Sequence, residues 1–172
     1  GTLTANGLDG SGKQVASYSI ATTGVAAGVQ LTLDAPSAST GTGSAIVADG
    51  EDTAMLRATI VDSKGAMVPG ANQNVTFKIV SGPGLVWATH NGDPANDSPS
   101  LAPWTPAYHG LARAYIRSTS DHATSPQHRQ RLRQIDLDSN VHVAPPDTTS
   151  APDPIVVEVS VAGGFSAQVS IP

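Results

Sequence analysis

The feature that most constrains the fold of this chain is a strict alternation of apolar and polar residues. In LRATIV, residues 56–61, apolar side chains alternate with Arg57 and Thr59, and NVTFKIV (residues 74–80) and LARAYIRS (residues 111–118) repeat the pattern. Successive side chains of a β-strand point to opposite faces, so each segment predicts a strand with one buried face. The residues predicted to face the core are Leu56, Ala58, Ile60, Val75, Phe77, Ile79, Ala112, Ala114 and Ile116.

Further short strands are predicted between turn signals rich in Gly, Asp and Pro. They begin at Val29 (VQLTLD), Ser44 (SAIV) and Leu85 (LVWAT), and the last of these makes Trp87 a predicted core residue. Near the end, IVVEVSV and FSAQVSI flank Gly163-Gly164, a pair typical of a β-hairpin turn.

Seven or eight short strands from residue 29 onward predict an all-β fold for most of the 172 residues. We expect an immunoglobulin-like β-sandwich, in which two antiparallel sheets pack face to face. A closed barrel is the alternative. The composition is typical of a turn-rich all-β protein, with 39% hydrophobic and only 13% charged residues, 17 Gly and 13 Pro.

One short helix is predicted near residues 126–136. Ser125 is a suitable N-cap, and Pro126 suits the first helical position. His128, Leu132 and Ile135 then share one face, which we expect to dock on the sandwich.

Residues 1–27 do not fit the sandwich. TLTANG and KQVASYSI predict two strands joined across LDGSG, and ATTGVAAG predicts a linker. Two strands alone cannot bury a core. We therefore expect residues 1–27 to be the last strands of a preceding, incomplete Ig-like domain plus a linker, and residues 28–172 to form the sandwich. The chain would then begin inside a domain of a longer protein.

Charge and residue content argue against several classes of function. The net charge of −5 argues against a nucleic-acid partner, and no apolar run reaches the length of a membrane span, so we expect no membrane partner. The absence of cysteine excludes disulfides, thiolate metal sites and a cysteine nucleophile. Two glycosylation sequons, at Asn74 and Asn96, fit a secreted protein, and we expect an extracellular location.

Neither a metal site nor a cofactor is expected. The five histidines lack the spacing of zinc ligands. The acidic turn that holds Asp49, Glu51 and Asp52 offers hard oxygen ligands for calcium, but we interpret it as a tight turn whose side chains bond their own backbone.

The long connection HNGDPANDSPSLAPWTPAYHG, residues 90–110, is where a binding site is most expected. Aromatic rings bind sugars through their faces while polar groups hold the hydroxyls, and Trp or Tyr can equally pin a long loop onto a sandwich. Both interpretations stay open. The candidate carbohydrate contacts are Trp104, Tyr108, His109, Asp93 and Asp97.

No catalytic residue is predicted. Glycoside hydrolysis uses two carboxyl groups across a cleft. The chain has only two glutamates, Glu51 in a turn and Glu158 pointing outward from a strand, and nothing pairs them. No nucleophile-elbow motif supports a serine triad.

Several segments resemble known families. DGEDTAMLRATIVDSKGAMVPGANQNVTFKIVSGPG, residues 49–84, resembles the bacterial Ig-like repeats of invasin and intimin. NGDP, residues 91–94, followed by AYHGLARAYIRST, residues 107–119, is similar to the C-terminal Ig-like domain of β-galactosidase-like glycoside hydrolase family two enzymes. Residues 1–24 are similar to the last strands of the domain that precedes it there, and residues 120–153 are the least typical part.

This resemblance implies a non-catalytic β-sandwich appended to a sugar-cleaving enzyme, whose catalytic residues lie in another domain. The implied partners are the other domains of a parent glycosidase and, through substrate contact, a poly- or oligosaccharide. The alternatives are a carbohydrate-binding module, free-standing or attached, and an adhesion-type Ig-like repeat.

Overall fold

The computed structural model describes residues 1–34, 46, 50, 52–119 and 154–172. Every regular element in these ranges is a β-strand. The predicted helix at 126–136 lies outside the described residues, as does nearly all of the strand predicted from Ser44. No helix in the described ranges is long and apolar enough to cross a lipid bilayer.

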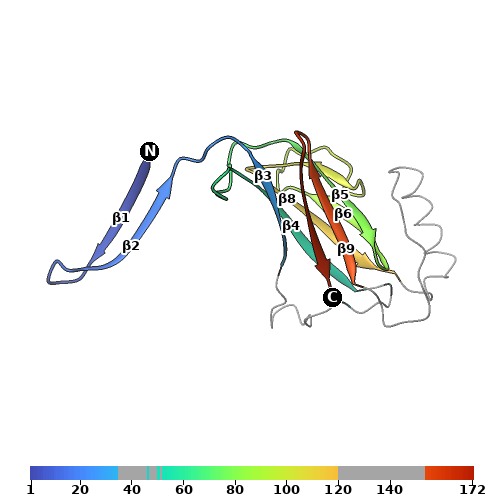
Figure 1. Cartoon of the computed structure of the whole chain (residues 1–172), viewed down its shortest axis with the longest axis horizontal. Coiled ribbons are helices and arrows are strands. Elements are labelled where there is room, and N and C mark those ends of the chain that lie inside the picture. The colour runs from blue at the N-terminus through green and yellow to red at the C-terminus, as the bar shows by residue number, and fades with distance from the viewer. Residues whose placement is uncertain (35–45, 47–49, 51, 120–153) are drawn as a thin grey trace.

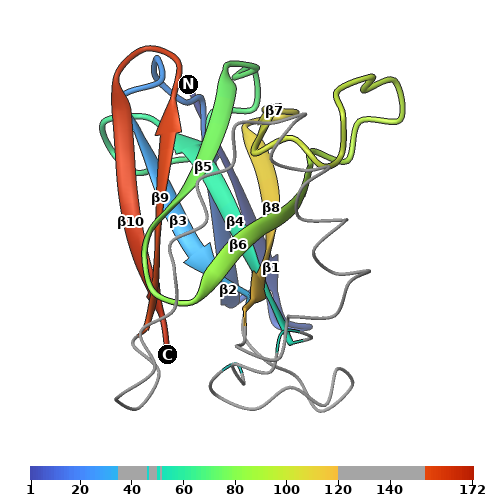
Figure 2. The ribbon, with the colours of Figure 1, turned by 90° about the vertical axis from the view of Figure 1, so that its right-hand side faces the viewer.

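Eight of the described strands form two four-stranded antiparallel sheets, which confirms the predicted sandwich. One sheet has the order β3 (Gly28–Leu33), β4 (Thr53–Val61), β8 (Leu111–Ser118) and β6 (Gly84–His90). The other has the order β10 (Phe165–Ile171), β9 (Ile155–Val161), β5 (Asn74–Ser81) and β7 (Trp104–Pro106). Figure 2 shows β9 and β10 in front of β3 and β4.

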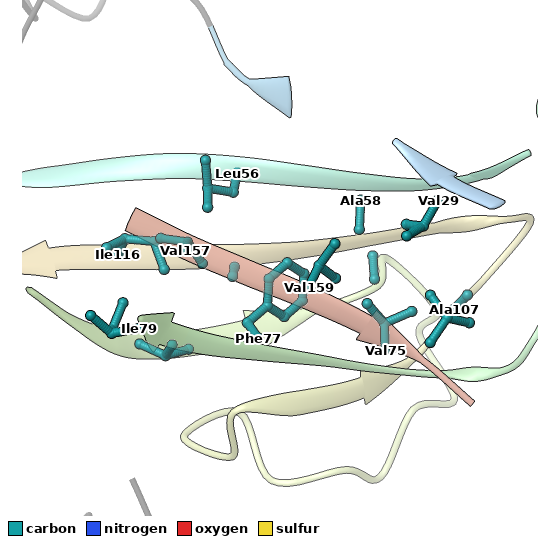
Figure 3. Close-up of a cluster of buried hydrophobic side chains, with 14 of the residues drawn as sticks. Val29, Leu56, Ala58, Val75, Phe77, Ile79, Ala107, Ile116, Val157 and Val159 are labelled. Carbon is teal, nitrogen blue, oxygen red and sulfur yellow. The ribbon is translucent and has the colours of Figure 1, made fainter. Parts of the chain in front are cut away.

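The core lies between the sheets and follows the alternation of the sequence. Every residue of the three alternating segments that is predicted to face it is buried, and Phe77 is the largest side chain that is almost fully enclosed, at 1% exposure. Figure 3 shows Phe77 and Val159 pointing into the space between the sheets, with Leu56 and Ala58 on the facing strand. Burial of these apolar side chains on folding is the main force that holds the sheets together.

The first two strands form a separate hairpin. β1 (Thr2–Leu8) pairs only with β2 (Gln14–Ala21), and every residue of both strands is exposed. Figure 1 shows this hairpin standing away from the sandwich at the end of a linker. The predicted pair of strands at the start of the chain is therefore confirmed.

The linker is tied to the sandwich by the carboxylate of Asp62, which follows β4. Asp62 Oδ2 accepts the Gly24 N–H at 2.8 Å, while its Oδ1 accepts the N–H groups of Lys64 at 2.9 Å and Ala66 at 3.0 Å. These bonds lower the pKa of Asp62, the Gly24 bond most of all. A carboxylate that accepts hydrogen bonds from several backbone N–H groups is strongly favoured over the protonated, neutral acid. One side chain thus holds both the turn that follows β4 and the path of the linker.

Two sequence-based predictions were wrong in detail. The 90–110 connection contains the short strand β7, which pairs with β5 through Thr105 and Val75. Three residues that include Pro106 are too few to show an alternation. Trp87 is only partly buried and lies outside the core, because a bulge between Val86 and Ala88 interrupts the register of β6.

Candidate functional site

The 90–110 connection is an ordered loop held mainly by hydrogen bonds from buried or partly buried polar side chains. Thr89 Oγ1 lies 3.0 Å from the carbonyl oxygens of Ala102 and Trp104. Asn91 Nδ2 donates to the Pro106 carbonyl oxygen at 2.9 Å. These side chains link the two ends of the loop to β6 and β7.

Trp104 and Tyr108 point outward from the second sheet's edge. Between them, Thr105 is 1% exposed and Ala107 is 4% exposed, whereas Trp104 and Tyr108 are each 37% exposed. This alternation puts both rings on the solvent side of the same stretch of chain, where each is partly packed and partly open. The structure therefore brings these two predicted residues to one outward face.

His109 is a central residue of the turn that leads into β8. It has φ 51° and is followed by Gly110 at φ 78°, and Tyr108 and Leu111 exchange backbone hydrogen bonds at 2.9 and 3.0 Å. Two central residues with positive φ make a tight two-residue hairpin turn that matches the twist of the strands. The His109 ring stands edge-on to the Tyr108 ring, with centroids 4.2 Å apart.

The two candidate aspartates lie elsewhere in the loop. Asp93 Oδ1 accepts the Ala95 N–H at 2.9 Å, and the Asp93 N–H donates to Asn91 Oδ1 at 2.9 Å. This is the local bonding of an Asx turn. Asp97 is exposed and follows Asn96, whose side chain lies 3.4 Å from Thr105 Oγ1. In the described part of the chain, no hydrogen bond joins either aspartate to Trp104.

Among the described residues, no hydrogen bond brings two carboxyl groups together. Glu158 lies in β9 opposite Lys78 in register, and its carboxylate accepts the Gln168 side chain at 2.9 Å. A general acid and its partner carboxylate must face each other across a substrate. Within these ranges no three His, Cys, Asp or Glu side chains gather as metal ligands would.

Sequence reasoning missed a cluster of cationic and aromatic side chains on the outer face of the first sheet. Arg57 of β4 lies directly opposite Arg113 of β8, which in turn lies opposite His90 of β6. Asp34 accepts from both guanidinium groups, from Arg57 Nη2 at 2.7 Å and from Arg113 Nη1. Tyr115 stacks on His90 with ring centroids 5.7 Å apart. We call these five residues the arginine row.

A second pair continues this face beyond the row. The Arg117 guanidinium lies over the Trp87 ring, 4.5 Å from its centroid, and Arg117 Nε donates to the Gly50 carbonyl oxygen at 2.7 Å. Such a cation–π contact explains how the bulge can hold Trp87 outside the core. The alternation of the sequence predicts which residues face outward, but only the register across three strands shows which of them meet.

This fold is also found in proteins of known structure. A search of curated proteins gives no match. Among solved structures, the whole chain matches 18% of a glycosyl hydrolase family 2 member from Bacteroides cellulosilyticus, with 21% identity and a TM-score of 0.71. It also matches 17% of a β-glycosidase from Bacteroides vulgatus, with 99% of this chain covered, 16% identity and a TM-score of 0.68.

A third solved structure, a β-glucuronidase from glycoside hydrolase family 2, matches 99% of this chain over 14% of its own, with 20% identity and a TM-score of 0.62. The chain thus spans less than a fifth of the length of each of these structures. A sequence profile of the family described as glycoside hydrolase family 2 C-terminal domain 5 matches residues 39–125, just over half of the chain. The chain therefore belongs to the family of C-terminal domains, type 5, of glycoside hydrolase family 2.

Proposed function

We propose that this chain is a non-catalytic accessory β-sandwich of a larger, β-galactosidase-like glycoside hydrolase. The observation that carries the proposal is the coverage of the structural matches. All of this chain corresponds to less than a fifth of a glycosidase. The described residues offer no facing pair of carboxylates, so the role left to the sandwich is to pack against other domains or to contact substrate.

The hairpin supports this proposal and the domain boundary that goes with it. β1 and β2 form a two-stranded sheet with one apolar face, which exposes Leu3, Tyr18 and Ile20 at 72%, 72% and 57%. The middle of the opposite face is polar, and Thr4 and Ser19 share a hydrogen bond of 2.7 Å across it. An isolated hairpin is at best marginally stable in water. Residues 1–27 are therefore proposed to complete a preceding Ig-like domain, and residues 28–172 to form the accessory sandwich.

The first test is the size and activity of the native gene product. An antibody against this chain would be used on immunoblots of cells and of culture fluid, with proteases inhibited. We expect a band far above 17.4 kDa, and an immunoprecipitate that hydrolyses aryl β-galactosides while the purified chain does not. A sole band near the mass of the chain, or hydrolysis by the chain alone, would contradict the proposal. The same blots show whether the protein is secreted.

A second candidate function is carbohydrate contact at the β7 edge. It is favoured by Trp104 and Tyr108, which present partly open rings on one outward face beside the polar side chain of Thr76. A ring with one free face suits a sugar, whose axial hydrogens pack on the aromatic surface while hydroxyls bond to polar neighbours.

This second function is tested by affinity electrophoresis on galactans, xylans and cell-wall polysaccharides. We expect the chain to be retarded by at least one of these, and the Trp104→Ala variant to migrate freely. Val80→Ala is a matched control, because Val80 is also an exposed apolar residue of the second sheet, at 49%. Equal retardation of Trp104→Ala and the unaltered chain would show that Trp104 is not the contact.

A further inference from the structure

We propose that the arginine row on the outer face of the first sheet is a docking surface for carboxylate side chains of another protein domain. The inference builds on the proposed function, under which that domain is a neighbour in a glycosidase. It concerns a different face from the β7 edge, because the row lies on β4, β8 and β6 of the other sheet.

The row carries a charge imbalance that no other side chain of the described residues relieves. Arg57 and Arg113 are directly opposed on neighbouring strands. Like charges directly opposite each other destabilise a sheet, and a guanidinium group stays charged at any accessible pH. Asp34 neutralises one of these two charges, because its two oxygens bind one guanidinium each. One positive charge therefore remains within the row, in a chain whose net charge is −5.

The guanidinium groups are also accessible. The side chains of Arg57 and Arg113 are 44% and 33% exposed. Among the described residues, their side-chain hydrogen bonds run to Asp34 and, for Arg113, also to the Met55 sulfur. Arg57 Nε is buried, but most of the other N–H donors have no partner among the described residues and are left for an outside acceptor. A carboxylate is the planar acceptor that matches the guanidinium fork, and a second carboxylate would balance the remaining charge.

The residue types of this face indicate a protein partner. Arg, Tyr and Met are enriched in protein interfaces, whereas Lys, Glu and Ser are depleted. Met55 and Tyr115 lie opposite each other next to the two arginines. The outer face of the second sheet is the internal control, because Lys78, Glu158 and Ser160 occupy it.

An acidic glycan fits the same face less well. Sugar recognition uses open aromatic faces. In the arginine row, His90 and Tyr115 stack on each other with 24° between their planes, so each ring gives one of its faces to the other. Beyond the row, the Trp87 ring is covered on one side by Arg117. The row therefore presents guanidinium groups beside rings that already stack on each other, an arrangement that suits acidic side chains on a protein surface.

The test is a titration of the full chain with a blocked deca-glutamate peptide, followed by NMR of the backbone amides and of the arginine Nε–H groups. We expect saturable shifts at Arg57, Arg113 and their strand neighbours, which vanish in ~1 M NaCl, where the Debye length is about 3 Å. Arg57→Gln and Arg113→Gln should each raise Kd about tenfold, the loss expected for a charge-assisted hydrogen bond to a carboxylate. Arg113→Lys should recover part of the affinity, because it keeps the charge without the fork.

Lys78→Gln is the matched control, since it removes one positive charge from the other sheet and should leave Kd within about twofold. If circular dichroism shows that Arg113→Gln does not fold, the Kd of Arg57→Gln is compared with that of Lys78→Gln instead, because Arg57 is the more exposed arginine. The proposal is overturned if the peptide causes no shifts at the row or if Lys78→Gln weakens binding as much as the arginine variants. It is also overturned if polygalacturonate displaces the peptide at a lower carboxylate concentration, because the face would then select an acidic glycan. None of these outcomes depends on the parent's mass or activity, so this inference and the proposed function can fail separately.

Discussion

The close approach of Gly110 to a neighbouring backbone gives a prediction with a matched control. Gly110 has φ 78°, its N–H donates to the Ala71 carbonyl oxygen, and its own carbonyl oxygen accepts from Ile60. A Cβ at this position would lie 2.5 Å from the Val68 carbonyl oxygen. Gly92, in the same connection, has φ 81° but has no heavy atom within 4 Å of its hypothetical Cβ.

Alanine substitutions at the two glycines therefore separate two contributions to the free energy of unfolding, the left-handed backbone conformation and the contact with neighbouring backbone. At Gly92 only the left-handed backbone conformation counts, which costs about 1–2 kcal/mol. At Gly110 the same cost applies, and the chain must also move by about 0.5 Å to relieve the contact with backbone. That movement weakens two backbone hydrogen bonds, each worth about 0.5–1.5 kcal/mol. We expect Gly110→Ala to cost about 2–5 kcal/mol in free energy of unfolding.

Urea unfolding followed by tryptophan fluorescence measures both variants, and calorimetry provides the melting temperatures. At about 2–4 °C per kcal/mol for a domain of this size, Gly92→Ala should lower Tm by ~2–8 °C and Gly110→Ala by ~4–20 °C. The change in unfolded-state entropy from Gly to Ala is common to the two and cancels in their difference. Equal losses in the two variants would refute the reasoning, because the contact with backbone would then contribute nothing.

Three further predictions concern the core, the linker and the arginine row. Phe77→Ala should lower the free energy of unfolding in urea by about 3–5 kcal/mol, because it removes the largest fully buried side chain and leaves a cavity between the sheets. A loss below ~1 kcal/mol would mean that the sheets close over the cavity. The pKa of Asp62 is lowered from its ordinary value of 3.8, so its contribution to stability is complete above that pH and is lost as the pH falls below it. Asp62→Asn should therefore reduce the fall in Tm that accompanies a fall in pH in the acid range, and it should speed hydrogen exchange of the Gly24 amide. An unchanged dependence of Tm on acid pH would contradict this. Asp34→Asn should destabilise the chain by less than ~1 kcal/mol, as expected for partly exposed charges, and adding Arg57→Gln should restore part of that loss if the opposed guanidinium groups repel.

The strands could be predicted because a strand's side-chain period is two and the sandwich buries one face of each sheet. Leu56 and Val75, like the other alternating apolar residues, are buried as the pattern requires. The same rule failed at Trp87, since the bulge at Val86/Ala88 adds one residue that no local signal marks. β7 was missed because its strand identity comes from pairing with β5 rather than from its own three residues.

The candidate sites were harder to predict than the strands, because they depend on register and on long-range hydrogen bonds. Tyr108 and Trp104 could be selected by residue type, yet their outward direction follows from Thr105, which is buried between them. The arginine row shows the limit more clearly, because Arg57 and Arg113 are 56 positions apart in sequence and each alone looks like an ordinary solvated strand residue. Only the pairing of β4 with β8 turns them into opposed charges. Such a pair costs stability unless acceptors balance it, and Asp34 balances only one of the two charges. The sheet register is therefore the physical reason to look for a partner on that face.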